Sequence, residues 1–196
     1  MADLGREKRV IDRKAFYDSI RESLFYGVLS QRQVDGMNVL LDIWESHFSN
    51  HDLRWLAYAL ATTFHETAYL MAPLEEYGKG EGKPYGEPAG PHGETYYGRG
   101  HVQLTWEDNY IKGEQALLNY NVQAPLHQYP HRMLEDETSA LVLYDGMIEG
   151  WFTGVGLPSF FNASTEDPVQ ARKIVNGLDK ADLIAGYYAS FKAALT

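Results

Sequence analysis

The stretch LRWLAYALATTFHETAYLMAPLEEYGKGEG, residues 53–82, joins a hydrophobic helical segment to a glycine-rich one and places acidic residues between them. Leu56, Leu60 and Phe64 recur at helical spacing and share one face of a helix. Aromatic and aliphatic side chains also occupy the other side, and a helix that is apolar on both sides is usually central and buried. The stretch therefore predicts a central helix that ends near Glu66.

Three carboxylates follow the apolar part of this stretch, and their positions suggest acid–base chemistry. At roughly 100° per residue, Glu66 lies about 160° around the helix from Phe64 and so leaves the main apolar face. Glu75 and Glu76 come next, at the start of the glycine-rich segment. Glycoside hydrolysis uses one carboxylic acid, kept protonated by apolar surroundings, and one carboxylate that stays ionised. Glu66 fits the first role and Glu75 or Glu76 the second, although spacing alone does not separate this hypothesis from ordinary solvated glutamates.

Hydrophobic periodicity in the rest of the chain predicts a mainly α-helical single domain, residues 1–196, with six to eight helices. Residues 78–100 hold eight of the 18 glycines and are expected to form a loop or a small hairpin, and no alternating strand pattern occurs outside 92–104. The other expected helices and caps are 16–24 ending at Gly27, 34–44 after a Ser30–Gln33 capping box, 53–66 after Ser49 or Asn50, 105–118 starting at Thr105 or Asp108, 137–152, 168–177 after Asp167, and a last helix after Asp179.

Composition excludes several function classes. The formal net charge of −10 argues against a nucleic-acid partner, which needs a basic face. No run of eighteen apolar residues occurs, so we expect no membrane span, and a chain without cysteine has no disulfide framework or thiolate metal site. The segment HETAY, residues 65–69, has Tyr69 where the H-E-x-x-H zinc motif has its second histidine. We therefore expect neither a metal nor a cofactor.

Four segments of the chain resemble the family 19 glycoside hydrolases, chitinase-like enzymes of the lysozyme superfamily. They are FHETA (64–68), YYGRGHVQLTWEDNY (96–110), ARKIVNG (171–177) and DKADLIAGYYASF (179–191). The second matches the family pattern Y-Y-G-R-G-x-x-Q-L-[ST]-x-x-x-N-Y, which is long and specific. The resemblance covers about residues 50–195 in order, and the first 50 residues, expected to form N-terminal helices, are less distinctive. The lack of cysteine and the short acid-to-base spacing resemble the compact phage and prophage endolysins more than the plant chitinases.

The resemblance implies roles for individual residues. Glu66 would be the general acid and Glu75 the general base, with Glu76 as the adjacent competitor. Thr105 would help to hold the nucleophilic water. The residues implied in sugar binding or in orienting the site are Tyr97, Arg99, Gln103, Asn109 and Asn176. Tyr97 also has an alternative as a core tyrosine, and Arg99 one as a purely structural residue.

The same resemblance implies a lysozyme-like helical domain, with the glycine-rich loop beside the active-site groove, that hydrolyses β-1,4 links between N-acetylated amino sugars. We expect peptidoglycan as the substrate and endolysin-type lysis of the cell wall as the function. A chitinase is the nearest alternative, and a non-catalytic glycan-binding domain is the alternative from another class. The segment MADLGREKRVIDRKAF, residues 1–16, has no apolar signal-peptide core. We expect a monomer made in the cytoplasm that reaches the wall through a holin or a secretion system.

Overall fold

The computed structural model describes residues 10–196, and the protein is mainly α-helical, as the sequence predicts. Within this range the only sheet is a pair of two-residue strands. The elements, in chain order, are α1 (Arg13–Leu24), α2 (Gln31–Ile43), the π-helix η1 (Trp44–Phe48), α3 (Leu53–Glu66), β1 (Leu74–Glu75), the 3₁₀ helix η2 (Pro84–Gly86), β2 (Arg99–Gly100), α4 (Glu107–Leu117), the 3₁₀ helices η3 (Leu118–Tyr120) and η4 (Pro130–Leu134), α5 (Asp136–Glu149), the 3₁₀ helices η5 (Leu157–Ser159) and η6 (Gln170–Ile174), and α6 (Ala181–Ala194).

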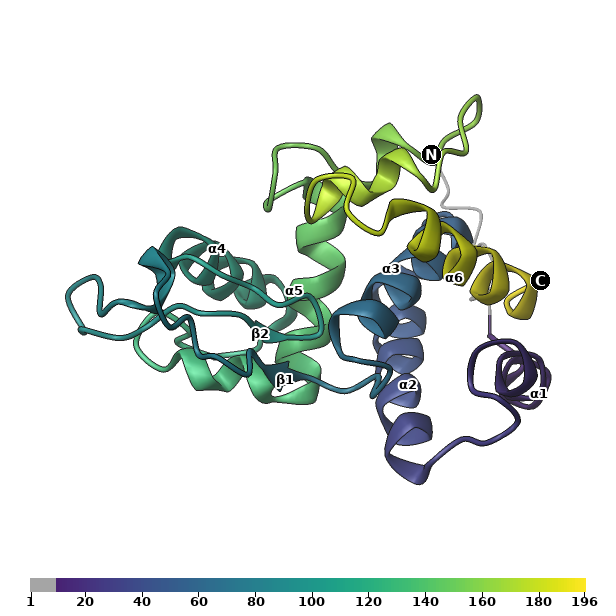
Figure 1. Ribbon diagram of the computed structural model, residues 1–196, viewed down its shortest axis with the longest axis horizontal. Helices are drawn as coiled ribbons and strands as arrows, with labels where there is room; N and C mark the ends of the chain where they lie inside the picture. The colour runs from purple at the N-terminus through teal and green to yellow at the C-terminus, as the bar shows by residue number, and fades with distance from the viewer. Residues whose placement is uncertain (1–9) are drawn as a thin grey trace, which may run out of the picture.

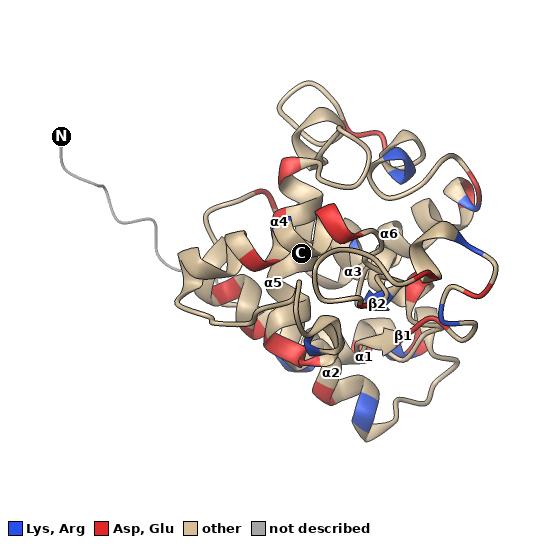
Figure 2. Ribbon diagram, turned by 90° about the vertical axis from the view of Figure 1, so that its left-hand side faces the viewer, with Lys and Arg blue, Asp and Glu red and all other residues tan. Residues whose placement is uncertain are grey.

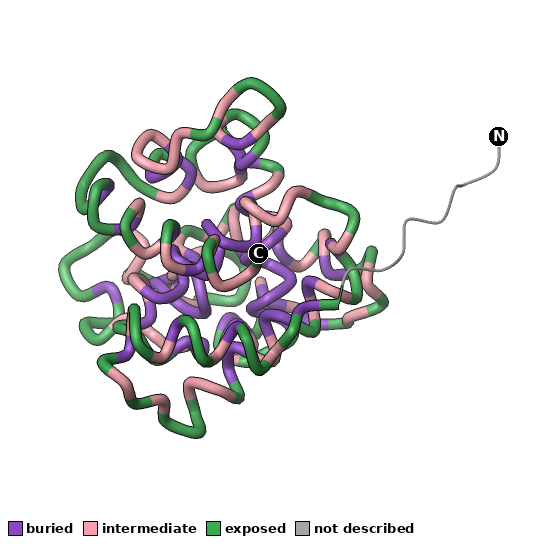
Figure 3. Tube along the Cα trace, turned by 90° about the vertical axis from the view of Figure 1, so that its right-hand side faces the viewer, coloured by how far each residue is buried: buried purple, intermediate pink, exposed green. Residues whose placement is uncertain are grey.

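Two buried helices, α3 and α5, form the centre of the protein (Figure 1). Every residue of α3 from Leu56 to Phe64 is buried, which confirms the prediction of a central helix. In α5 every residue from Thr138 to Tyr144 is buried as well. α6 packs against α3 and α1, whereas α2 and α4 pack against α5. Figure 3 shows the buried segments gathered in the interior and the exposed segments on the outer turns.

The start of α3 differs from the prediction, whereas the start of α2 does not. The capping box of Ser30 and Gln33 is present at α2. The prediction of Ser49 or Asn50 as the cap of α3 is wrong, because α2 continues directly into the π-helix η1 and these two residues close that helix. Asp52 caps α3 instead and accepts a hydrogen bond from a backbone N–H of its first turn.

Two other predicted helices differ from the observed ones in length or type. α5 ends at Glu149 rather than at residue 152, because Gly150 takes a left-handed conformation with φ +72°. The segment 168–177 forms only the short 3₁₀ helix η6. The prediction that Asp167 caps this helix is wrong, because Val169 is at the cap position of η6, although Asp167 Oδ1 accepts a hydrogen bond from the Gln170 backbone N–H at 3.0 Å in the turn before it.

The starts of α4 and α6 carry no side-chain caps. α4 begins at Glu107, within two residues of both predicted starts, and Trp106 at its cap position has φ +72°. The prediction that Asp179 caps α6 is wrong, because α6 begins only after Lys180, which takes a left-handed conformation. The backbone carbonyl of Asp179 instead accepts a hydrogen bond from the Arg172 side chain at 3.1 Å.

The strands β1 and β2 form an antiparallel pair in which Glu75 lies opposite Arg99. The prediction that strands occur only within 92–104 is therefore wrong for β1, whose two residues are too few to leave an alternating pattern. Gly100 of β2 has φ +86°, and a β-carbon there would stand 2.6 Å from Ser139 Oγ of α5. Glycine at this position therefore allows the pair to lie close against α5.

The glycine-rich loop between β1 and β2 folds back on itself. A β-carbon on Gly80 would lie 2.6 Å from the Gly86 α-carbon, so this approach of two backbone segments requires glycine. The loop and α4 lie on one side of the molecule, and α1 and α6 lie on the other (Figure 1). Figure 2 shows the acidic residues spread over several helices and loops. None of the described helices is long and apolar enough to cross a membrane.

Candidate active site

Glu66 is the last residue of α3, and it forms an ion pair with Arg172 of η6. Arg172 Nη1 donates a hydrogen bond to Glu66 Oε1 at 2.7 Å. The side chains of Arg172 and Glu66 are only 4% and 17% exposed, so the pair is largely shielded from solvent. The surroundings of Glu66 are therefore less apolar than the sequence predicts, because a charged partner lies beside the carboxylate.

The second carboxylate oxygen of Glu66 is open. Glu66 Oε1 is bound by Arg172, whereas Oε2 accepts no hydrogen bond from residues 10–196. The neighbouring His65 is half-buried, and this burial lowers the pKa of His65, so its ring is neutral at neutral pH. Glu66 therefore has one carboxylate oxygen fixed by Arg172 and a second oxygen with no hydrogen-bond partner among these residues.

Glu75, in β1, is held by a tyrosine and a lysine. Tyr97 Oη donates a hydrogen bond to Glu75 Oε2 at 2.8 Å, and Lys79 Nζ lies 3.1 Å from Oε1. The hydrogen bond from Tyr97 and then the contact with Lys79 hold the pKa of Glu75 below its ordinary value. The Glu75 side chain is 38% exposed. Glu75 is thus an ionised and accessible carboxylate, which suits a group that accepts a proton from water.

Glu76 has different partners from its neighbour. The Gly98 backbone N–H donates to Glu76 Oε2 at 3.2 Å, and Tyr85 Oη lies 3.4 Å from Oε1. The Glu76 backbone N–H donates to the Gly98 carbonyl at 2.7 Å. These contacts extend the pairing of β1 and β2 and satisfy backbone groups of that segment. They favour Glu75 rather than Glu76 as the candidate base.

Arg99 is buried, and no carboxylate within the described residues pairs with it. Its Nη1 donates to the Thr95 carbonyl at 2.9 Å and to the Tyr110 hydroxyl at 3.0 Å. Its guanidinium carbon lies 3.6 Å from the centre of the Tyr97 ring, a cation–π distance. Arg99 therefore fixes the orientation of Tyr97, whose hydroxyl in turn holds Glu75.

Two residues predicted to bind sugar use their amide N–H groups in internal contacts. Gln103 Nε2 donates to the carbonyls of Leu74, at 3.0 Å, and Gly100, at 3.2 Å. Asn109 Nδ2 donates to the Thr105 carbonyl at 3.0 Å. Thr105 is half-buried, and its hydroxyl makes no hydrogen bond with residues 10–196. Gln103 and Asn109 thus support the strand pair and the start of α4.

The structure places the predicted site residues in two groups. The first lies at the end of α3 and around η6, where Asn176 is exposed and its backbone N–H donates to the Arg172 carbonyl at 3.0 Å. The second lies around β1, β2 and the start of α4. In the part of the chain that the structure describes, no hydrogen bond or ion pair joins the two groups. No three histidine or carboxylate side chains there come together as metal ligands do. The members of the second group are Glu75, Tyr97, Arg99, Gln103, Thr105 and Asn109.

Sequence analysis missed the two basic partners of the carboxylates. Arg172 belongs to the segment ARKIVNG, but nothing in the sequence shows that it meets Glu66, which lies 106 residues away. Lys79 lies four residues after Glu75, a spacing that indicates an ion pair only within a helix. Here the chain turns, with φ +48° at Lys79, and the turn brings the ammonium group back to the carboxylate.

Comparisons with protein-family models and with curated protein sequences find no match. Comparison with solved structures finds family 19 chitinases. Chitinase C from Streptomyces griseus HUT6037 has a TM-score of 0.59 and 19% identity, over 97% of this chain and 95% of that chain. A mutant of chitinase C has a TM-score of 0.57 and 20% identity over the same shares. A bacterial family 19 chitinase has a TM-score of 0.54 and 21% identity, over 95% of each chain. The chain therefore has the fold of these chitinases.

Proposed function

We propose that the protein is a glycoside hydrolase that cleaves β-1,4 links between N-acetylated amino sugars, with Glu66 as the general acid and Glu75 as the general base. The observation that carries this proposal is the contrast between the two carboxylates. Glu66 is shielded and anchored through a single oxygen, whereas Glu75 is accessible and its pKa is lowered. Two carboxylates in different environments, on a fold shared with family 19 chitinases, fit the chemistry of glycoside hydrolysis.

The proposed reaction is a single displacement by water. Glu66 gives its proton to the glycosidic oxygen as the bond from that oxygen to the anomeric carbon breaks. Glu75 takes a proton from a water molecule, and the oxygen of that water forms the new bond to the anomeric carbon. Thr105, whose hydroxyl makes no hydrogen bond with residues 10–196, would hold this water. Attack from the face opposite to the leaving group inverts the anomeric configuration.

We infer that peptidoglycan is the substrate. The resemblance to compact endolysins supports it, and so does the composition of the glycine-rich loop after β1. A muramic acid unit carries a lactyl-peptide branch at O3, so an enzyme that binds it needs open space beside the sugar chain. The segment 78–95 has few bulky side chains and mostly exposed residues, which supports the inference of such space. We place the action of the protein at the bacterial cell wall, after release through a holin or a secretion system.

Chitin is the second candidate substrate, because the similar solved structures are chitinases. The two polymers differ by the lactyl group on alternate sugars, and specificity is a difference in transition-state binding. Purified peptidoglycan and purified chitin should be digested separately, reduced with borohydride and analysed for sugar alcohols. We expect muramitol from peptidoglycan, because cleavage after muramic acid leaves that sugar at the reducing end. Glucosaminitol alone from peptidoglycan, or activity on chitin only, would contradict the inference.

A non-catalytic glycan-binding domain on the same fold is the alternative from another class. Such a domain would bind the polymer and release no reducing ends. The partners of Glu66 and Glu75 argue against it, because a domain that only binds has no need for two carboxylates in such different environments. A lack of new reducing ends from either polymer, with binding retained, would support this alternative instead.

A further inference from the structure

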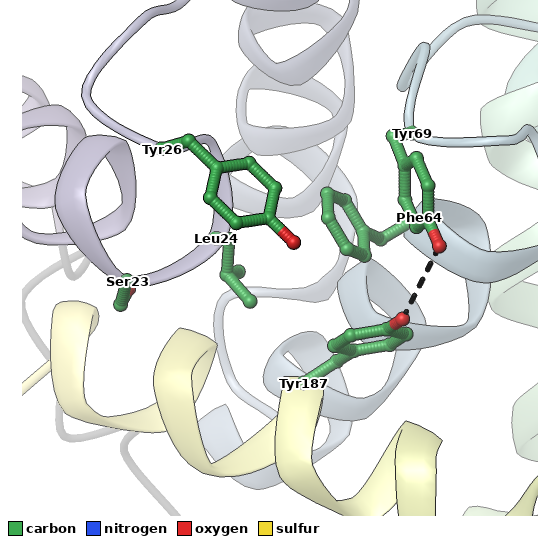
Figure 4. Close-up of a pocket in the computed structure, with 6 residues that line it drawn as sticks. All are labelled: Ser23, Leu24, Tyr26, Phe64, Tyr69 and Tyr187. Carbon is green, nitrogen blue, oxygen red and sulfur yellow. Dashed lines mark hydrogen bonds between the residues drawn. The ribbon is translucent and has the colours of Figure 1, made fainter.

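A small aromatic pocket lies between the end of α1, the end of α3 and the middle of α6 (Figure 4). Its volume is about 130 Å³, which is below the range of pockets that hold whole drug-sized ligands and suits a single ring or substituent. Figure 4 shows rings from all three helical regions around the same space. The residues that line the pocket are Ser23, Leu24, Tyr26, Phe64, Tyr69 and Tyr187. We call it the tyrosine pocket.

The chemistry of the lining selects an uncharged ligand. None of the six lining side chains carries a charge, although 22% of the chain is charged. Four of the six bear a hydroxyl group, three of them on aromatic rings. Hydroxyl groups donate and accept hydrogen bonds, and aromatic faces cover apolar surface. The combination suits a ring with hydroxyl groups on its edge and C–H groups on its face, which is the chemistry of a neutral sugar.

Two of the tyrosines of the pocket expose much of their surface to solvent. Tyr26 is 98% exposed and Tyr69 is 49% exposed. Their φ angles are +53° and +70°, in the left-handed region that bulky residues rarely adopt. Both strained residues present their rings to the same pocket (Figure 4).

The hydroxyl groups of the pocket are available as neutral partners. The oxygens of Tyr69 and Tyr187 lie 3.5 Å apart, at the outer limit for a hydrogen bond, so each keeps capacity for a ligand. Burial raises the pKa of Tyr187 to about 12, so its hydroxyl stays protonated at neutral pH. Phe64 forms the inner wall, with ring centres 4.6 Å from that of Tyr69 and 4.7 Å from that of Tyr187.

The tyrosine pocket is separate from the candidate active site. Phe64 lines the pocket, whereas Glu66 points to Arg172 on another side of α3, about 160° around the helix axis. The two sites are nevertheless close, because Tyr69 follows Glu66 by three residues, which limits the distance between their α-carbons to about 11 Å. The tyrosine pocket and the Glu66 carboxylate thus lie on different sides of the end of α3, within one small region of the protein.

We propose that the tyrosine pocket binds one N-acetylated amino-sugar unit of a second glycan strand, outside the candidate active site. It holds the protein on an insoluble polymer while the active site acts on a neighbouring strand. The identity of the polymer rests on the proposed function. Binding at the pocket does not, because it requires no hydrolysis.

The test measures how the full-length protein binds insoluble polymer. The protein carries Glu66→Gln, so that it does not hydrolyse the polymer during the measurement. Tyr26→Ala and Tyr26→Phe are added to it, and the fraction bound is measured on purified peptidoglycan and on purified chitin. Loss of one aromatic contact of about 1.4 kcal/mol weakens binding about tenfold. We expect that loss for Tyr26→Ala and near-parental binding for Tyr26→Phe, on whichever polymer the protein binds. Because Tyr26 makes almost no internal contact, the variant is expected to fold.

The matched control is Tyr129→Ala, which removes another exposed tyrosine, 45% exposed, that does not line the pocket. Equal loss by the Tyr26 and Tyr129 variants, or no loss by Tyr26→Ala, overturns the proposal. A second measurement titrates the soluble tetramer of N-acetylglucosamine and follows backbone amide signals by NMR. We expect shifts at Tyr26, Tyr69 and Tyr187, and shifts confined to the residues around Glu75 overturn it. If the wild type cuts neither polymer while Tyr26-dependent binding persists, the proposed function fails and this proposal stands.

Discussion

The Glu66 carboxylate and the Arg172 guanidinium lie 2.7 Å apart and join the end of α3 to η6 across 106 residues of sequence. Arg172 also donates to the Asp179 carbonyl just before α6, so one side chain ties together three segments. A charge-assisted hydrogen bond of this kind fixes geometry as well as adding energy. The position of the candidate acid therefore depends on η6, and not only on the helix that carries Glu66.

Arg172→Met should destabilise the protein, because it leaves the shielded Glu66 carboxylate without its partner. Breaking a largely buried ion pair by removing one member costs about 3 kcal/mol or more. The measurement is the free energy of unfolding from denaturant titration, for Arg172→Met and for the wild type. The control is the double variant Glu66→Gln/Arg172→Met, which removes the unpaired charge. We expect it to be more stable than Arg172→Met alone, and equal stability of the two would contradict the account.

Glu75→Gln should lower kcat far more than Glu76→Gln. The first change removes the candidate base, and loss of general base catalysis costs roughly 10²–10⁴-fold. The second keeps an oxygen that accepts the hydrogen bond from the Gly98 N–H, so we expect a loss of less than about tenfold. Both changes keep side-chain volume, which makes them matched variants. A greater loss for Glu76→Gln would transfer the role of base to that residue.

The pH profile should respond to Lys79. Tyr97 and Lys79 hold the pKa of Glu75 below its ordinary value, so Glu75 remains an ionised base as the pH falls. Lys79→Met removes one of these two causes and raises the pKa of Glu75, which moves the acidic limb of the kcat/KM profile to higher pH. Lys83→Met, in the same loop, is the control because Lys83 has no contact with Glu75. An unchanged acidic limb in Lys79→Met would show that Glu75 is not the base.

The free energy of unfolding should decrease below pH 6.5 because of His101. This residue is fully buried, neither of its ring nitrogens has a hydrogen-bond partner among residues 10–196, and burial lowers the pKa of His101 to about 3. Between that value and the ordinary pKa of 6.5, the unfolded chain binds a proton that the folded protein does not. This residue's contribution is therefore complete above pH 6.5, and it is lost as the pH falls toward 3, by about 1.4 kcal/mol per pH unit.

His101→Leu should flatten that dependence, and the exposed His131→Leu should not. The check is the free energy of unfolding measured at several pH values between 4 and 7 for both variants and the wild type. Equal slopes for His101→Leu and the wild type would show that the ring is already protonated or hydrated in the folded protein.

Much of the helical fold can be predicted from the sequence, because helices and their caps depend on residues that are close together in the chain. The apolar pattern from Leu56 to Phe64 is sufficient to predict a buried helix, and the capping box at Ser30 is sufficient to place the start of α2. The two-residue strand β1 has no such signal, since only its pairing with β2 makes it a strand. Asp179 has the right chemistry for a cap, but its carbonyl is bound by Arg172, a contact distant in sequence.

The candidate site also combines features that depend on neighbouring residues with features that depend on contacts distant in sequence. The glutamates stand out in the sequence because of their neighbours, but what surrounds each one depends on the tertiary fold. Neither the pairing of Glu66 with Arg172 nor the stacking of Arg99 on Tyr97 has a local pattern.

The release of reducing ends from purified peptidoglycan by Glu66→Gln, compared with the wild type, tests the central claim most directly. The change removes the transferable proton and keeps the volume of the side chain. We predict a loss of roughly 10²–10⁴-fold in rate, in a protein whose near-ultraviolet circular dichroism matches that of the wild type. A folded Glu66→Gln protein that releases reducing ends at a rate close to that of the wild type would contradict the assignment of Glu66 as the general acid.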